Sequence, residues 1–527
     1  MKMDGDVKKA ADADSRDGVY SWYVLFVLLL VCISNFVDRQ IISILAESIK
    51  ADLGLTDDQL GVLYGTVFAI FFALFGIPLG RLADGWYRGR LISVGLVLWS
   101  MMTTASGLAT SFAQLAFARM GVGIGEATAV PAAYSLLGDH FSRERKGFIL
   151  AIYMAGAHVG IGLSLVLGGF VLSSWGTWFP NDTAPMGLAG WQAAFIIAGL
   201  PGFVLALWVL TLREPMRGLS EGIPAPVVRP NVWRDFTSEL MSIVPPFTLL
   251  VVARQPNGLR NNLVIAAAIA GAAYLLIALT GDYVQWLAVS IGLYSIASWV
   301  QTVRFRDAPT FALTWGEPYV IGAVIGFGMI VFMTNTAGFW FSPYAMRHFG
   351  IPAEAAGAFI GIPGAIASVV GVIGGGKLSD YWKARDPRGR IFTCMLAIVG
   401  SALFAVAAFS VTSLELYFVF VACAFLVGNL WLGPAVATLQ DLVLPRMRGI
   451  AAATSSIGST MVGYALGPYL SGKVAVLTGS LKIGVLSLFL LAPVALLLLW
   501  AVSRKIGTLE ATRLERAIAA GEQTSSS

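Results

Sequence analysis

The chain has 527 residues, of which 57% are apolar and only 12% carry a charge. Soluble domains carry charge on about 25% of their residues, so a water-soluble globular protein is excluded. One membrane crossing takes about 20 apolar residues, so this composition allows at most about fifteen crossings. The sequence therefore predicts an all-α membrane protein that crosses the bilayer many times.

The charged and sulfur-containing residues narrow the function further. The 35 basic and 30 acidic residues leave a net charge of only +5, so their positions carry more information than their sum. The three cysteines, Cys32, Cys394 and Cys423, all lie inside apolar runs and indicate neither disulfides nor metal ligands. The chain has three histidines and no recognisable catalytic arrangement of residues. We therefore expect no enzyme, no metal site, no cofactor and no nucleic-acid partner.

Apolar stretches of spanning length follow one another along the chain from residue 22 onward. Fourteen of them are predicted, at 22–46, 59–80, 91–111, 113–138, 148–174, 191–212, 262–280, 284–303, 318–339, 355–376, 391–410, 414–440, 450–472 and 483–502. A polar leader, residues 1–20, precedes them, and a polar tail, residues 506–527, follows. Basic residues concentrate in alternate connections, and the remaining connections hold only Lys50, Arg347, Lys473 and Lys482. Because basic loops stay on the cytoplasmic side, we expect both termini to be cytoplasmic.

One long polar connection divides the chain. Residues 214–261 are rich in proline and are predicted to form a cytoplasmic linker. Within this linker, apolar residues at helical spacing predict a short amphipathic helix, which lies either on the membrane surface or against the protein: Trp233, Phe236, Leu240, Met241 and Val244. The next two stretches, within residues 262–304, form a hydrophobic hairpin. Twelve helices remain, six in residues 21–213 and six in residues 317–505.

The two sets of six helices resemble each other in sequence. Residues 55–84 align without a gap with residues 351–380, and Pro131 in the fourth stretch aligns with Pro434 in the twelfth. Parallel repeats of this kind are typical of transporters that move one half against the other around a central site.

The repeated segment carries a charged motif. It reads Gly-Arg-Leu-Ala-Asp-Gly-Trp-Tyr-Arg-Gly-Arg over residues 80–90 and returns as Gly-Lys-Leu-Ser-Asp-Tyr-Trp over residues 376–382, with Arg-Gly-Arg at 388–390. This motif resembles the signature loop of the major facilitator superfamily. The resemblance implies the major facilitator fold, here with a two-helix hairpin inserted between two six-helix halves, which gives 14 transmembrane helices. It also implies a cytoplasmic gate in which glycines let helices approach and aspartates pair with arginines or cap a neighbouring helix, formed by Gly80, Asp84, Arg88, Arg90, Gly376, Asp380 and Arg388.

Within the superfamily, the chain is similar to Spinster proteins. The similarity lies in Asn35–Arg39, Leu55–Gly61 and Gly123–Ala127. It implies a bacterial homologue, expected as a monomer in the inner membrane among membrane lipids. Such a protein uses a proton gradient, by symport or antiport, to move a lysolipid or a sphingosine-type lipid.

Four ionisable residues lie inside predicted helices of the first half: Asp38, Arg39, Arg119 and Glu126. Each costs about 2.5–3.5 kcal/mol at a helix centre, so they need partners or water. In the second half Ala422 and Asn429 align with Arg119 and Glu126, so the repeat keeps the scaffold without these charges. We predict that Asp38 and Glu126 carry protons, that Arg119 competes for them, and that Arg39 binds an anionic head group. The alternative is a buried ion network that only fixes helix register.

Aromatic and amide side chains are further candidates for substrate contact: Phe36, Tyr64, Phe68, Tyr153, Asn335 and Asn429. His158 either titrates near neutral pH or is simply packed. Two other functions stay open. One is a proton-coupled carrier of small amphipathic or organic anions, and the other is a receptor or scaffold that uses a transporter fold without turnover.

Overall fold

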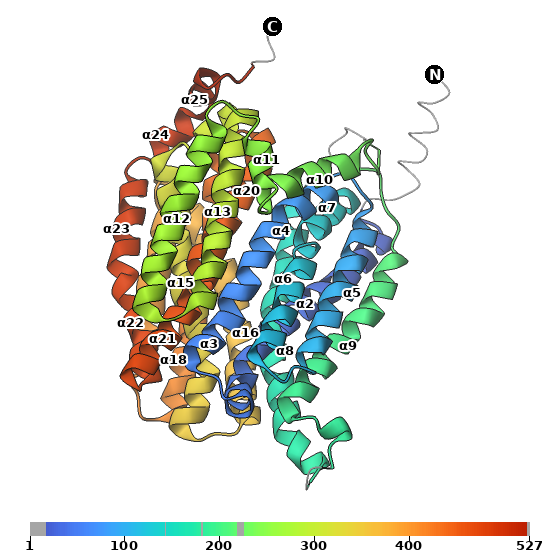
Figure 1. Ribbon diagram of the computed structural model, residues 1–527, viewed down its shortest axis with the longest axis vertical. Helices are drawn as coiled ribbons and strands as arrows, with labels where there is room; N and C mark the ends of the chain where they lie inside the picture. Colours follow the sequence, from blue (N-terminus) through green and yellow to red (C-terminus); the bar gives the residue numbers. More distant parts are fainter. Residues whose placement is uncertain (1–16, 143, 181–182, 219–225, 524–527) are drawn as a thin grey trace.

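The computed structural model describes residues 17–142, 144–180, 183–218 and 226–523. Residues 1–16 of the predicted leader and 524–527 of the predicted tail lie outside the described residues. Figure 1 shows a bundle of long helices whose axes are nearly parallel, with the first and the last described residues on one side. We call this side the terminal end and the opposite side the distal end.

Eleven helices within the described ranges are long and apolar enough to cross a membrane. The protein is therefore an integral membrane protein with an all-helical fold. The predicted stretches 91–111, 113–138 and 450–472 are not among the eleven. The last two are each divided into shorter helical segments, as described below.

The helices fall into two groups along the chain. The first group comprises α2 (Val19–Leu53), α3 (Asp57–Gly61), η1 (Val62–Thr66), α4 (Val67–Ala83), α5 (Arg88–Ser106), α6 (Phe112–Glu126), α7 (Ala129–His140), α8 (Lys146–Trp178) and α9 (Gly190–Leu210). The second comprises α15 (Pro318–Phe349), α16 (Ala353–Lys383), α17 (Gly389–Ala408), α18 (Leu414–Gly428), α19 (Leu432–Asp441), α20 (Arg448–Gly458), η5 (Ser459–Tyr464), α21 (Gly467–Thr478), α22 (Leu481–Leu488) and α23 (Ala492–Ser503). We refer to these groups as the first half and the second half.

Shorter helices and a hairpin connect and follow the two halves. They are α10 (Val232–Ile243), α11 (Thr248–Val252), the hairpin α12 (Gly258–Thr280) and α13 (Tyr283–Arg306), α14 (Ala308–Leu313), and the tail helices α24 (Ile506–Ala511) and α25 (Arg513–Ala519). Helix α10 packs on the protein through Val232 and Ile243, which are buried, and Phe236, which is partly buried. Trp233 and Met241, which belong to the predicted apolar face, are exposed.

Two long predicted stretches are broken at matching places in the repeat. The stretch 113–138 is divided into α6 and α7 just after Glu126, and the stretch 414–440 is divided into α18 and α19 at Asn429. Each break lies a few residues before a proline, Pro131 or Pro434, whose missing N–H cannot continue the helical hydrogen bonds. The breaks place one polar side chain from each half at the middle of the bundle.

The halves make their closest contacts near the distal end. Gly357 and Gly361 of α16 lie directly against the backbone of α8, and a Cβ atom on Gly357 would overlap the carbonyl group of Leu165. In α3, Gly61 lies in the same way against Pro468 of the second half. Ion pairs reinforce this contact, since Arg347 donates to Glu47 at 2.7 Å and to Asp57 at 2.6 Å.

At the terminal end, the glycines of the repeated motif make no such contact. Space remains around a Cβ atom placed on Gly80 or Gly376, with no atom within 4 Å among the described residues. These two glycines therefore have room beside them in this conformation, whereas the neighbouring Gly375 lies directly against the Leu430 carbonyl group of its own half. The tight contacts between the two halves lie at the distal end, so the structure is one in which the distal end is closed.

We expect Gly357→Val to prevent this closure, because the added side chain has no room against the backbone of α8. Cysteines substituted for Ser173 and Glu354 report the closure through the disulfide that they form. The two positions are close in the closed state, where the Glu354 N–H donates to the Ser173 hydroxyl at 3.2 Å. The rate of disulfide formation between the two cysteines should fall at least about tenfold, which corresponds to roughly 1.4 kcal/mol.

Gly374→Val is the matched control on the same helix, because a Cβ atom there reaches only the edge of Leu430 at 4.0 Å. Both substitutions carry the same intrinsic helix cost. Equal cross-linking in the two variants would contradict closure through Gly357.

Candidate functional site

The four ionisable residues predicted from the sequence meet in one buried cluster, which we call the ionic centre. Asp38 and Arg39 lie in the middle of α2, Arg119 lies in α6, and Glu126 ends α6 where the helix breaks. Asp38, Arg119 and Glu126 have no exposed surface, and Arg39 is 8% exposed. Ionisable groups buried to this degree in a membrane protein need partners.

Arg39 and Glu126 form the ion pair of the centre. The Arg39 Nη2 and Nε atoms both donate to Glu126 Oε2, at 2.7 and 3.0 Å. The guanidinium also lies over three aromatic rings, with its carbon atom 4.8, 4.5 and 4.9 Å from the ring centres of Phe36, Phe68 and Phe72. These contacts hold the positive charge in an aromatic box that excludes water.

Arg119 takes a different place from the one predicted. Its Nη1 and Nη2 atoms donate to the backbone carbonyl groups of Asp38 and Arg39, at 3.0 and 3.2 Å, and not to a carboxylate. The predicted partners are therefore exchanged: Arg39, expected to bind substrate, holds Glu126. The reason is geometric, because Glu126 lies two turns beyond Arg119 along α6 and meets Arg39 of α2 there.

Asp38 is the member of the centre that lacks a bonded partner. Its side chain interacts with Trp99 and with the charges of Glu126 and Arg119, but no hydrogen bond of ordinary geometry reaches either oxygen from the described residues. The Oε1 atom of Glu126 is in the same situation. A buried carboxylate without donors is costly when ionised, so Asp38 is chemically suited to take up a proton, whereas Glu126 is held by its ion pair with Arg39.

The predicted aromatic residues lie at different places in the structure. Phe36 and Phe68 belong to the box around Arg39. Tyr64 donates to Gln40 Oε1 at 2.9 Å and stacks on Phe339 of the second half, with ring centres 4.3 Å apart. Tyr153 lies elsewhere, buried in the first half against Tyr134, and it does not line the cavity described next.

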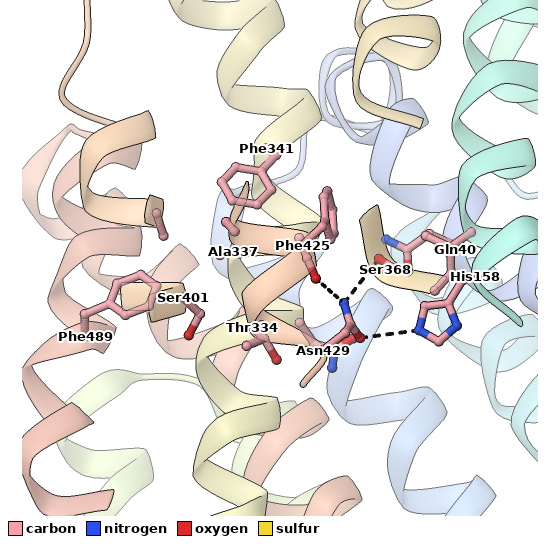
Figure 2. A pocket seen from close by; sticks show the side chains of 16 residues that line it. Gln40, His158, Thr334, Ala337, Phe341, Ser368, Ser401, Phe425, Asn429 and Phe489 are labelled. Carbon is pink, nitrogen blue, oxygen red and sulfur yellow. Dashed lines mark hydrogen bonds between the residues drawn. The ribbon is translucent and has the colours of Figure 1, made fainter. Parts of the chain in front are cut away.

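A cavity of about 70 Å³ lies between the halves and extends into the second half. Figure 2 shows that Asn429 points toward His158 across this boundary, 3.3 Å from its Nε2 atom. The Asn429 amide also donates to Ser368 Oγ at 3.2 Å and to the Phe425 carbonyl at 2.7 Å. The predicted amides Asn335 and Asn429 both line the cavity, together with Gln40, Thr334, Ser401 and the rings of Phe341, Phe425 and Phe489.

The cavity wall holds amides, hydroxyls and rings, and His158 is the only ionisable side chain among the residues that line it. Sequence reasoning missed Gln40 and Ser368. Ser368 is a hydrogen-bond partner of Asn429, which the sequence did single out.

The arginines of the repeated motif bind within their own half rather than across the gate. Arg88 is fully buried and donates to Asp139, and also to Glu214 at 2.6 Å. In the second half Arg390 likewise donates to Asp441. Arg390, rather than the gate candidate Arg388, therefore makes the ion pair in the second half that corresponds to the pair of Arg88.

The other charged residues of the predicted gate lie at the surface. Arg388 contacts only Asp386, at 3.9 Å, and Arg90 lies over the ring of Tyr87 at 4.4 Å. Asp84 is exposed, and Asp380 is 3.9 Å from Arg390 with 74% of its side chain exposed. Among the described residues, no side-chain cap from either aspartate is found at the start of α5 or α17 in this conformation.

No group of three or more histidine, cysteine, aspartate or glutamate side chains that could hold a metal ion occurs within the described ranges. The ionic centre offers instead two arginines, two carboxylates and an adjoining polar cavity. This arrangement can bind an anionic or amphipathic molecule and can exchange protons.

Transporters are among the known proteins whose sequences are similar to this chain. An MFS-type efflux pump of Mycolicibacterium smegmatis is 28% identical over 464 residues, which cover 88% of this chain and 86% of the pump. The 4-hydroxybenzoate transporter of Pseudomonas aeruginosa is 26% identical over 361 residues, covering 67% of this chain and 72% of the transporter.

A solved structure extends the likeness to the whole fold. It is a bacterial homologue of the human lysosomal transporter Spinster in an inward-facing and occupied conformation, with a TM-score of 0.62 and 24% identity, covering 95% of this chain and 96% of that one. The fold therefore resembles that of a bacterial Spinster homologue, as the motifs predicted. In sequence, the spinster protein of Drosophila melanogaster is 29% identical over 208 residues, which cover 40% of this chain and 32% of that protein. The profile of the Major Facilitator Superfamily matches residues 27–468. The chain belongs to the Major Facilitator Superfamily and is a membrane transporter.

Proposed function

We propose that the protein is a proton-coupled secondary transporter that moves an amphipathic molecule, namely a lysolipid or a sphingosine-type lipid, by alternating access. The observation that supports proton coupling is the environment of Asp38. This carboxylate is fully buried beside two arginines, yet it receives no ordinary hydrogen bond from the described residues. A proton gradient would supply the energy, and no further cofactor is required.

Charge balance links the proton to the substrate. When both carboxylates are ionised, the two positive and two negative charges of the centre cancel. When Asp38 binds a proton, the centre carries one net positive charge, which attracts an anionic head group to Arg39 or Arg119. A head group that takes Arg39 from Glu126 frees that carboxylate, so binding and proton uptake favour each other.

The cavity gives the second part of the substrate site. Asn335, Asn429 and Ser368 offer hydrogen bonds to a polar head group, and Phe341, Phe425 and Phe489 offer apolar surface to an acyl chain. At about 70 Å³ the cavity holds a few water molecules, so a lipid requires the two halves to move apart. A small aromatic or organic anion needs less space, and the similarity to a 4-hydroxybenzoate transporter favours it as the second candidate.

The proposed arrangement in the membrane follows from the same helices. Fourteen crossings, with the α12–α13 hairpin inserted between two six-helix halves, would put both chain termini on one side of the membrane, and the basic connections would make that side the cytoplasm of a bacterial cell. The protein would then work as a monomer in the inner membrane. The closed distal end would face outward, so this conformation would be inward-facing.

Counterflow in proteoliposomes tests this proposal. Purified protein is reconstituted with a pH gradient or without one and is offered labelled lysophosphatidylethanolamine, sphingosine and 4-hydroxybenzoate. We expect saturable exchange of one lipid probe and its accumulation only with the gradient. Exchange of 4-hydroxybenzoate alone would establish the second candidate, and a receptor or scaffold would exchange none of the three.

A further inference from the structure

The inserted hairpin lies on the seam between the two halves. In Figure 1, α13 is on the side of the hairpin that faces α4. Gly292 of α13 marks the closest point, where a Cβ atom would lie 3.1 Å from Met461 Sδ of the second half and 3.4 Å from Ile70 of the first. The hairpin therefore contacts both moving parts of the transporter.

Gln285 of α13 forms hydrogen bonds with both halves at once. Its Nε2 atom donates to the Ala465 carbonyl of the second half at 3.0 Å. Its Oε1 atom is 2.5 Å from the hydroxyl of Thr66 in the first half, and this hydroxyl is also 2.7 Å from the Ala465 carbonyl. Gln285 and Thr66 have no exposed surface, so water cannot replace these bonds in this conformation.

The two residues that Gln285 joins adjoin two unusual helical turns. Thr66 ends the π-helical turn η1, and Ala465 directly follows the π-helical turn η5. The two turns lie against each other, since a Cβ atom on Gly65 would overlap the Tyr464 carbonyl. A π-turn widens the helix and leaves backbone groups in need of other partners, which explains the polar side chains gathered here.

Each π-turn carries a tyrosine toward the substrate site. Tyr64 of η1 donates to Gln40, which lines the cavity. Tyr464 of η5 interacts with Arg39 of the ionic centre. The contact made by Gln285 therefore adjoins the residues that position these two tyrosines.

A second set of contacts fixes the start of α13 at the distal end. Asp282 lies 2.6 Å from Lys473 Nζ and accepts a hydrogen bond from the Tyr469 hydroxyl at 2.7 Å. Lys473 also pairs with Asp58 of the first half at 3.3 Å. These bonds keep Gln285 in register with the two π-turns.

We propose that Gln285 is a positioning residue of the transport cycle, which holds η1 and η5 together and so favours the conformation with a closed distal end. The inserted hairpin is then a working part of the gate rather than a peripheral addition. This deepens the proposed function, because it adds a residue of the hairpin to the alternating-access cycle.

The first test measures the closure itself and needs no substrate. In protein with alanine at Cys32, Cys394 and Cys423, the pair Ser173→Cys and Glu354→Cys reports distal closure through oxidation by copper phenanthroline. Gln285→Met keeps the size of the side chain but makes no hydrogen bond. We expect disulfide formation to slow by about threefold to tenfold, the fold-change that a net hydrogen bond is worth.

Gln301→Met is the matched control on the same helix. Gln301 donates to the Gly258 carbonyl at 2.8 Å and accepts from Asn262, so its bonds stay within the hairpin. We expect this variant to cross-link at the wild-type rate. Equal rates in wild type and Gln285→Met, or equal slowing in Gln285→Met and Gln301→Met, would overturn the proposal.

The second test separates this contact from a general loss of stability. Thr66→Val removes the same contact from the first half. The double variant Gln285→Met with Thr66→Val should therefore cross-link no more slowly than the slower single variant. Two independent effects would instead multiply the loss of rate. Thr66→Ser keeps the hydroxyl and should restore the rate. Thr66→Val also tests the contact if Gln285→Met fails to fold. Because cross-linking uses no substrate, its outcome does not depend on which probe is transported.

Discussion

Replacing Glu126 by glutamine should abolish uptake and also destabilise the protein, because it leaves the buried Arg39 guanidinium without a counter-charge. Breaking a buried ion pair by removing one partner costs about 3–5 kcal/mol, which corresponds to roughly a hundredfold to a thousandfold in an equilibrium. We expect a clearly lower unfolding temperature and an initial uptake rate reduced at least about a hundredfold. Glu354→Gln, an exposed residue at the start of α16, should leave both unchanged.

A double variant distinguishes chemistry from architecture at the same pair. Buried ion pairs replaced by apolar residues of similar volume often give proteins of equal or greater stability. Arg39→Met with Glu126→Leu should therefore regain much of the lost unfolding temperature while uptake stays absent. Measured uptake near the wild-type rate in the double variant would show that the pair only fixes helix register.

Replacing Asp38 by asparagine should uncouple transport from the proton gradient. The substitution keeps the shape of a side chain that receives no ordinary hydrogen bond from the described residues, so we expect the protein to fold normally. The asparagine mimics the protonated carboxyl group in charge. Exchange of substrate across the membrane should continue, while accumulation driven by a pH gradient should fall at least about tenfold, because general acid–base and coupling groups act only if they can titrate.

The control for this prediction is Asp235→Asn on the exposed side of α10. It makes the same chemical change far from the ionic centre along the chain. Gradient-driven accumulation should stay at the wild-type level in this control. Asp38→Asn protein that accumulates substrate as wild type does would exclude Asp38 from proton coupling.

The sequence predicted the helical class because the length of a hydrophobic stretch depends on local composition. It also predicted which four charges share a site, since so few ionisable residues lie inside apolar stretches. It did not predict the pairing within the site. Whether Arg39 or Arg119 meets Glu126 depends on the rotation of α2 against α6, which spacing along one helix does not determine.

The helix breaks and the hairpin contact show where other signals lay. Pro131 and Pro434 aligned in the repeat, and with the polar residues before them they mark the breaks that present Glu126 and Asn429. Gln285, by contrast, is a polar residue near the start of an apolar helix, with nothing in the sequence to name its partners. Such contacts depend on tertiary packing between elements distant in the chain.

The ionic centre as a proton-coupling site is the central claim, and proton flux measures it directly. Proteoliposomes that contain a pH-sensitive dye receive the probe that is exchanged in counterflow, with no gradient imposed. The account predicts that the probe drives a change of internal pH in wild-type vesicles and none in Asp38→Asn vesicles that still exchange it. Substrate movement without any pH change in wild type, or the same pH change in both proteins, would contradict it.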